Sequence, residues 1–180
     1  LHFNIFRMRH TLFPSLLLFA AAQCLPTEAV AQGWPSQYDG VMLQGFYWNS
    51  YGDSQWSFLE QQSDELSKYF SLIWVPQSGN CNSTYNVMGY MPVYYYDHNS
   101  SFGSESQLRS MISTFRDKGT GIIADVVINH RNNLGVDGSW VDFPEETYNG
   151  ETFHMLPADI CANDDKGQTR SWADKQGISI

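Results

Sequence analysis

Three short apolar segments alternate with two amphipathic ones through the middle of the chain, and this order limits the folds open to it. We expect strands over residues 40–48, 71–75 and 121–128, because these segments are rich in β-branched and aromatic side chains. We expect helices over residues 57–70 and 104–119 between them. Apolar strands that alternate with helices predict a parallel sheet covered by helices, so the expected fold class is α/β.

Capping boxes predict where both helices begin. SFLE (57–60) and SESQ (104–107) each place a serine hydroxyl three residues before a Glu or Gln, so that both side chains can satisfy free backbone amides. Gly119 provides a stop for the second helix. The apolar faces expected to face the sheet contain Leu59, Leu66, Tyr69 and Phe70 in the first helix and Leu108, Met111, Ile112 and Phe115 in the second.

The third apolar segment contains and ends in polar residues. In GIIADVVINH (121–130), Asp125 interrupts the apolar run, and Asn129 and His130 close it. An unpaired buried carboxylate costs several kcal/mol, so Asp125 must have hydrogen-bond partners. Because parallel α/β folds bind ligands at the carboxyl ends of their strands, Asn129 and His130 are predicted to lie at a binding edge.

The loop after the second predicted strand opens on the same edge and is rich in tyrosine, which suits stacking against sugar rings. Its tyrosines are Tyr85, Tyr90, Tyr94, Tyr95 and Tyr96. Each feature also has a simpler interpretation, because an asparagine at a strand end commonly forms a turn, a histidine there commonly has a structural hydrogen bond, and tyrosines commonly pack. Spacing alone therefore predicts an α/β domain with a candidate site.

The net charge limits the classes of binding partner that we expect, and the N-terminal segment indicates the location of the protein. The formal net charge of −9 disfavours nucleic acid and anionic membranes as partners, because both require clustered Lys and Arg. Residues 1–31 are predicted to be a secretory signal peptide, with a basic start, the apolar run LFPSLLLFAAA (12–22) and the small-x-small site AVA (29–31). The alternative for that run is a buried strand or helix. We expect an exported monomer, periplasmic or extracellular, with no membrane contact after cleavage.

Export would also allow a disulfide. Cys81 and Cys161 follow the predicted signal peptide and would meet an oxidising compartment. Their spacing does not establish whether they pair.

Several motifs in the right order resemble one family. DVVINH (125–130) resembles the end of the third barrel strand in the α-amylase family of glycoside hydrolases. GVMLQGFYW (40–48) is similar to the first strand of that family, WVPQSG (74–79) to the end of the second, MGYMPVYYYD (88–97) to the following loop, and FGSESQLRSMISTFRDKG (102–119) to the second helix. The resemblance covers about residues 40–165.

The resemblance implies an architecture for the whole chain. Residues 32–130 would be the first three β/α units of a (β/α)8 TIM barrel, and residues 131–180 would begin an irregular, calcium-associated insertion domain after the third strand. A full barrel takes about 250 residues, so this chain is expected to be the N-terminal part of a longer enzyme.

The resemblance also assigns roles. It makes His130 a hydrogen-bond donor to the sugar beside the scissile bond, Tyr90 the platform for that sugar, and Asp125 a structural acceptor. Asn129 would bind Ca²⁺ through its side-chain oxygen, since Ca²⁺ takes six to eight oxygen ligands. ICANDD (160–165) is similar to an acidic segment of some members. Further candidate metal ligands are therefore Asp159, Asp164 and Asp165.

The implied activity is endo-hydrolysis of α-1,4-glucosidic bonds in starch-like glucans with retention. That reaction needs two carboxyl groups about 5 Å apart, and the family carries them on later strands, with no match before Ile180. We interpret Glu145 and Glu146 as solvated surface, and we expect these 180 residues alone to be inactive. The alternatives are a glucanotransferase or an oligosaccharide-trimming relative, a non-catalytic glucan-binding protein of the same fold, and a calcium-dependent lectin-like module.

Overall fold

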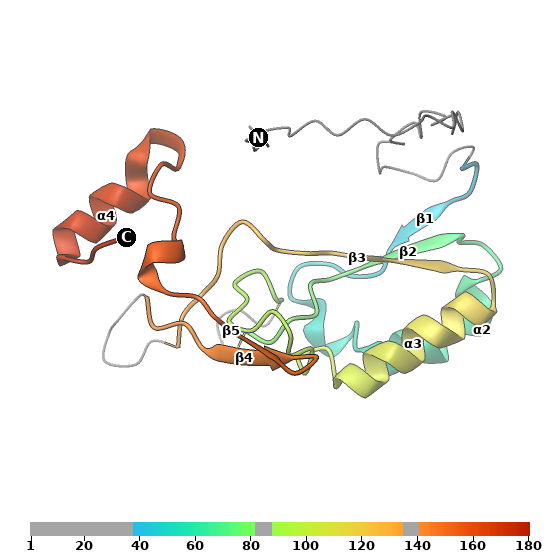
Figure 1. Ribbon diagram of the computed structural model, residues 1–180. Coiled ribbons are helices and arrows are strands. Elements are labelled where there is room, and N and C mark those ends of the chain that lie inside the picture. The colour runs from blue at the N-terminus through green and yellow to red at the C-terminus, as the bar shows by residue number, and fades with distance from the viewer. Residues whose placement is uncertain (1–37, 82–87, 135–140) are drawn as a thin grey trace, which may run out of the picture. The chain divides into compact units, whose positions relative to one another are not determined.

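A computed structural model describes residues 38–81, 88–134 and 141–180. The chain divides into two units, Leu1–Tyr38 and Asp39–Ile180, and the second contains every helix and strand named below (Figure 1). The expected signal peptide and Tyr85 lie outside the described residues. Within the described ranges, no helix combines the length and the apolar character needed to cross a bilayer.

Three parallel strands form the main sheet, in the order β1-β2-β3. They are β1 (Met42–Gln44), β2 (Leu72–Val75) and β3 (Gly121–Ala124). The connecting helices are α1 (Trp56–Gln61), α2 (Ser63–Leu66) and α3 (Glu105–Asp117). Figure 1 shows these helices on one side of the sheet, as expected when right-handed crossovers join strands in sequential order. The predicted α/β class is confirmed.

The hydrophobic core lies between the sheet and these helices. On β2, Ile73 and Val75 are buried in this core, whereas Leu72 and Trp74 alternate with them and are only half-buried. The strand face opposite the helices is therefore less buried than the face that packs against them. The buried core residues are Trp56, Leu59, Ile73, Val75, Met88, Phe102, Leu108, Met111 and Phe115.

The third strand is shorter than predicted. β3 ends at Ala124, which pairs with Val75, the last residue of β2 before Pro76. One further bond joins the Asp125 amide to the Val75 carbonyl, at 3.3 Å. Beyond it, Val126 and Ile128 are 67% and 82% exposed, so a buried strand through residue 128 is wrong. The cause is that β2 has ended and offers no further partner.

The capping box of α3 is confirmed. The Gln107 amide donates to the Ser104 hydroxyl at 3.3 Å, and the Ser104 amide donates to Gln107 Oε1 at 2.8 Å. Leu108, Met111 and Phe115 are buried, as predicted. Ile112, predicted on the same face, is partly exposed.

The capping box predicted for the first helix is wrong. α1 begins at Trp56, without a side-chain cap, and the Trp56 amide donates to the Phe102 carbonyl at 2.9 Å. Glu60 instead accepts hydrogen bonds from Ser110 and Thr114 of α3, at 2.8 and 2.7 Å. This tertiary role takes the carboxylate away from the helix start.

The first helix is also divided in two. Gln62, with φ −89° and ψ 0°, separates α1 from α2, and α2 ends at Leu66 rather than near Phe70. Tyr69, predicted on the buried face, is exposed because it lies beyond the helix.

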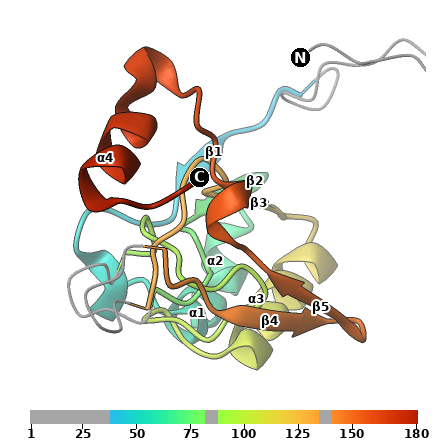
Figure 2. The same cartoon turned by 60° about the vertical axis from the view of Figure 1, so that its left-hand side comes forward.

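Residues 141–180 contain regular structure that the sequence analysis missed. β4 (Glu145–Tyr148) and β5 (Glu151–His154) form an antiparallel hairpin, visible in Figure 2. Asn149 and Gly150 connect them with φ values of 52° and 81°, as a two-residue hairpin turn requires. A further helix, α4 (Gln168–Gln176), follows. The expectation of irregular structure is wrong for these elements. Single 3₁₀ turns lie at Ser50–Gly52, Pro157–Asp159 and Asp165–Gly167.

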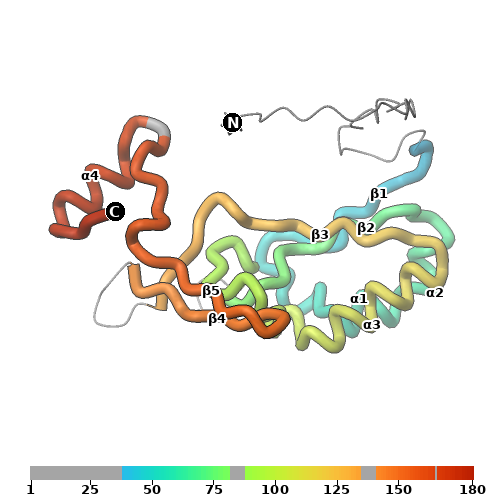
Figure 3. The backbone as a smooth tube through the Cα atoms, in the orientation of Figure 1, coloured from blue at the N-terminus to red at the C-terminus, as the bar shows by residue number. Residues whose placement is uncertain are grey.

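The tube in Figure 3 traces the path from β3 toward the segment that precedes β4, past the loop after β2. Hydrogen bonds of Tyr90, in the loop after β2, with Asp125 and His130 link this loop to the segment after β3. The disulfide that the sequence allowed is not formed, since both Cys81 and Cys161 are free thiols.

Candidate functional site

Three of the predicted site residues lie together at the carboxyl end of the parallel sheet. The Tyr90 hydroxyl, from the loop after β2, donates to Asp125 Oδ2 at 3.0 Å. Nε2 of His130 lies 2.7 Å from the Tyr90 carbonyl oxygen. Asp125 directly follows β3, so the end of one strand and the loop after its neighbour form a single rim.

The contacts of His130 define its tautomer. A carbonyl oxygen only accepts, so Nε2 carries a proton and donates to Tyr90. Nδ1 can then accept from Asn129 Nδ2, which lies 3.4 Å away. Both side chains are exposed. A sugar oxygen that accepts from His130 Nε2 must therefore displace the Tyr90 carbonyl oxygen.

The Tyr90 hydroxyl is a reliable donor. Burial, and then the hydrogen bond to the Asp125 carboxylate, raise the pKa of Tyr90 well above its usual value. The hydroxyl keeps its proton at neutral pH, and Asp125 thus has the partner that its position required.

Trp48 is a site residue that the sequence analysis missed. Its ring is stacked on that of Tyr90, with centroids 6.0 Å apart and planes 14° from parallel. The Trp48 side chain is 69% exposed. The available signal was an aromatic residue at the end of the first predicted strand, because this end lies at the same edge of the sheet.

A cavity of about 140 Å³ lies beside this rim. It is smaller than the ~300–1,000 Å³ typical of pockets for drug-sized ligands. This rim is therefore open rather than an enclosed pocket, and the Trp48 ring is exposed on it. The cavity is lined by Gln77, Ser78, Gly79, Tyr94, Tyr95, His98, Ala124, Asp125, Val126 and Val127.

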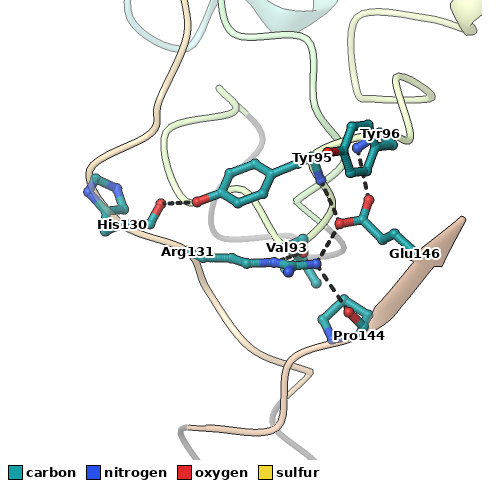
Figure 4. Close-up of polar contacts among 7 residues, drawn as sticks. All are labelled: Val93, Tyr95, Tyr96, His130, Arg131, Pro144 and Glu146. Carbon is teal, nitrogen blue, oxygen red and sulfur yellow. Dashed lines mark hydrogen bonds and ion pairs between the residues drawn. The ribbon is translucent and has the colours of Figure 1, made fainter. Parts of the chain in front are cut away.

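A buried ion pair lies next to the rim (Figure 4). Arg131 Nη2 lies 2.6 Å from Glu146 Oε2, and the two side chains are only 4% and 6% exposed. The interpretation of Glu146 as solvated surface is wrong, because Arg131 and two backbone amides satisfy its carboxylate. Glu145, its neighbour on β4, is exposed as predicted.

Among the candidate metal ligands whose side chains are described, Asp159 and Asp164 contact residues of their own segment rather than Asn129. Asp159 accepts from the Leu156 amide at 2.8 Å, and Asp164 accepts from the amide and hydroxyl of Thr169. Both carboxylates thus have local partners, and no contact joins either to Asn129. The side chain of Asp165 lies outside what is described. No cluster of three His, Cys, Asp or Glu residues suited to a metal occurs in the described ranges.

Known proteins provide an independent comparison. No protein-family model matches the chain. It is 28% identical over 131 residues to chloroplastic alpha-amylase 3 of Arabidopsis thaliana, which covers 72% of this chain and 14% of that protein. It is 29% identical over 126 residues to the alpha-amylase of Bacillus licheniformis, covering 64% of this chain and 24% of the relative. This chain is related to the α-amylases.

The α-amylase relationship predicted from the motifs is therefore confirmed, and it rests on sequence. Alpha-amylase I from Eisenia fetida matches 52% of this chain and 19% of its own, with 26% identity and a TM-score of 0.45. That score is too low to establish a shared fold. The chain also spans less than a quarter of each of the two α-amylases compared above, so the comparison leaves most of their length unmatched.

Proposed function

We propose that this chain supplies part of the glucan-binding rim of an α-amylase, a retaining endo-hydrolase of α-1,4-glucosidic bonds in starch-like glucans. The observation that carries the proposal is the meeting of Tyr90, Asp125 and His130 at the carboxyl end of a parallel sheet. Relatives named as α-amylases support it, as do those named as glucan maltotetraohydrolases.

The residues of the rim would bind and orient the sugar. Tyr90 and Trp48 would present ring faces to the apolar face of a glucose unit, and His130 would donate to a sugar oxygen. Asp125 would hold Tyr90 in place and would not attack the sugar, because its carboxylate already accepts from that hydroxyl. The two reacting carboxyl groups, about 5 Å apart in retaining enzymes, would come from outside this chain.

The strand order supports a barrel as the complete fold. Parallel strands in sequential order with helices on one side are the repeating unit of a (β/α)8 wall. Residues 32–130 would supply three such units, and residues 131–180 would begin the insertion domain. Residues 1–31 would direct export of a monomeric enzyme.

Glucan affinity tests the rim. We expect His130→Ala to weaken maltohexaose binding by the full chain about 2- to 10-fold, the effect of losing one hydrogen bond of ~0.5–1.5 kcal/mol. Tyr90→Ala should weaken it further, because the variant also loses the stacking surface. Isothermal titration calorimetry measures both, with Arg116→Ala on the exposed surface of α3 as the unaffected control. Unchanged affinity in both rim variants would remove them from the site.

Starch hydrolysis tests whether this segment binds glucan without cleaving it. The 180-residue chain should release no reducing sugar from starch, because the retaining reaction needs two carboxyl groups about 5 Å apart that flank the bond, and the proposed role of Asp125 at the rim is structural. A protein that joins this segment to the two reacting carboxyl groups should release sugars that retain the α-anomer. Hydrolysis by the verified 180-residue chain alone would contradict the proposal.

Calcium binding through Asn129 is a separate proposal. Because Asp159 and Asp164 have local partners, they would have to leave the Leu156 amide and Thr169 to bind the same ion as Asn129. We expect Ca²⁺ to raise the unfolding temperature of the protein, with a stabilisation of about 2.7 kcal/mol at a Ca²⁺ concentration 100 times Kd. Asn129→Ala should reduce this shift. Equal shifts for the two proteins would exclude Asn129 as a ligand.

A further inference from the structure

The buried pair of Arg131 and Glu146 satisfies four backbone groups from two regions of the chain. Arg131 donates to the Val93 carbonyl at 2.8 Å and to the Pro144 carbonyl at 3.3 Å. Glu146 accepts from the amides of Tyr95 and Tyr96 at 3.0 and 2.8 Å. The pair therefore fastens the loop after β2 to the start of the β4–β5 hairpin.

The same pair reaches the rim through Tyr95 (Figure 4). The Arg131 guanidinium lies over the Tyr95 ring, 5.0 Å from its centroid. The Tyr95 hydroxyl donates to the His130 carbonyl at 3.2 Å, and the Tyr95 amide donates to Glu146. Because Arg131 also follows His130 in the chain, these contacts close a ring that holds the His130 carbonyl and the residue after it.

Fixing this backbone determines where the imidazole lies. His130 Nε2 donates to the carbonyl of Tyr90, which belongs to the same loop as Val93 and Tyr95. A shift of the loop relative to residue 130 would change this distance, and with it the spacing between the imidazole and the Tyr90 ring. The loop after β2 carries Tyr90 and the segment after β3 carries His130. The distance between these two segments therefore sets the distance between the two binding side chains.

We propose that Arg131 and Glu146 are positioning residues, whose buried ion pair sets the place of His130 relative to Tyr90. Neither side chain would touch the sugar. The expected effect on glucan binding rests on the proposed function. The position of His130 relative to Tyr90 does not, because it can be measured in the ligand-free protein.

The ligand-free experiment follows the His130 ring by NMR in the full chain. Arg131→Met should shift the ring resonances of His130, because the fastened loop is released. Arg131→Lys keeps the charge but cannot donate to Glu146, Val93 and Pro144 together, so an intermediate shift is expected. Phe115→Leu is the control, since it removes packing from α3 in the core and touches none of these groups. If Arg131→Met does not fold, the lysine variant decides.

The second experiment measures maltohexaose affinity at a temperature where every variant is folded. Arg131→Met should weaken binding about tenfold and Arg131→Lys less, while Phe115→Leu should lower stability without changing affinity. If affinity follows stability alone across the three variants, the pair is only structural and the proposal is overturned. If the unsubstituted chain binds no maltohexaose, the proposed function fails. If the His130 ring resonances do not move in either arginine variant, the positioning claim is overturned, whether or not the chain binds maltohexaose.

Discussion

Replacing Arg131 by methionine should lower the free energy of unfolding by about 3–5 kcal/mol, because the Glu146 carboxylate would remain buried without its charged partner. Both side chains are almost fully buried, so water cannot replace the lost contact without opening the loop. Urea denaturation followed by tryptophan fluorescence measures the change. A loss below about 1 kcal/mol, typical of exposed ion pairs, would contradict the burial of the pair.

The double variant Arg131→Met, Glu146→Met should not recover the lost stability. Hydrophobic replacement of a buried ion pair is often neutral or stabilising. Here, however, it would leave the amides of Tyr95 and Tyr96 and the carbonyls of Val93 and Pro144 without their partners. Each buried polar group left unsatisfied costs about 1–3 kcal/mol. Recovery to the stability of the unsubstituted chain would show that these backbone groups find other partners.

Gly89→Ala should destabilise the protein by about 2–5 kcal/mol. Gly89 has φ +92°, which costs an L-residue about 1–2 kcal/mol, and an added Cβ would lie 2.5 Å from the Gln77 carbonyl oxygen. Relief requires movement of Gln77, a buried residue whose amide donates to the Gly89 carbonyl at 3.0 Å. Overpacking of this kind typically adds about 1–3 kcal/mol.

Gly150→Ala is a matched control for the steric clash between an added Cβ at residue 89 and Gln77. Gly150 has φ +81°, but an added Cβ there meets no atom within 4 Å. Its alanine variant should therefore show only the conformational cost, and the difference between the two variants in urea denaturation measures the contact with Gln77. Equal losses of stability would mean that the loop around Gly89 accommodates a methyl group freely.

Local signals in the sequence predicted local structure well. The Ser104 and Gln107 side chains need only each other's backbone, so the capping box of α3 could be identified from four residues. The equally good pattern at residues 57–60 failed, because Glu60 forms hydrogen bonds with residues of α3 that lie about 50 positions away. The end of β3 was likewise determined by its neighbour, since β2 stops before Pro76.

A site residue could be predicted from the sequence where its side chain required a hydrogen-bond partner. An acidic residue inside the apolar run made a partner for Asp125 necessary, although the identity of that partner, Tyr90, emerged only from the fold. Glu146 carried no such signal, because its partner Arg131 lies 15 positions earlier, outside any regular element. Trp48 was interpreted as a strand residue, and its pairing with Tyr90 depends on how the segment after β1 meets the loop after β2.

The short outer strands of the main sheet have a consequence for self-association. Among the described residues, β1 and β3 each have one edge without a strand partner, and such edges can recruit strands of other molecules into fibrils. At three and four residues, these edges offer few backbone groups to a second copy. Growth of cross-β fibrils from them should therefore be slow even in concentrated solution.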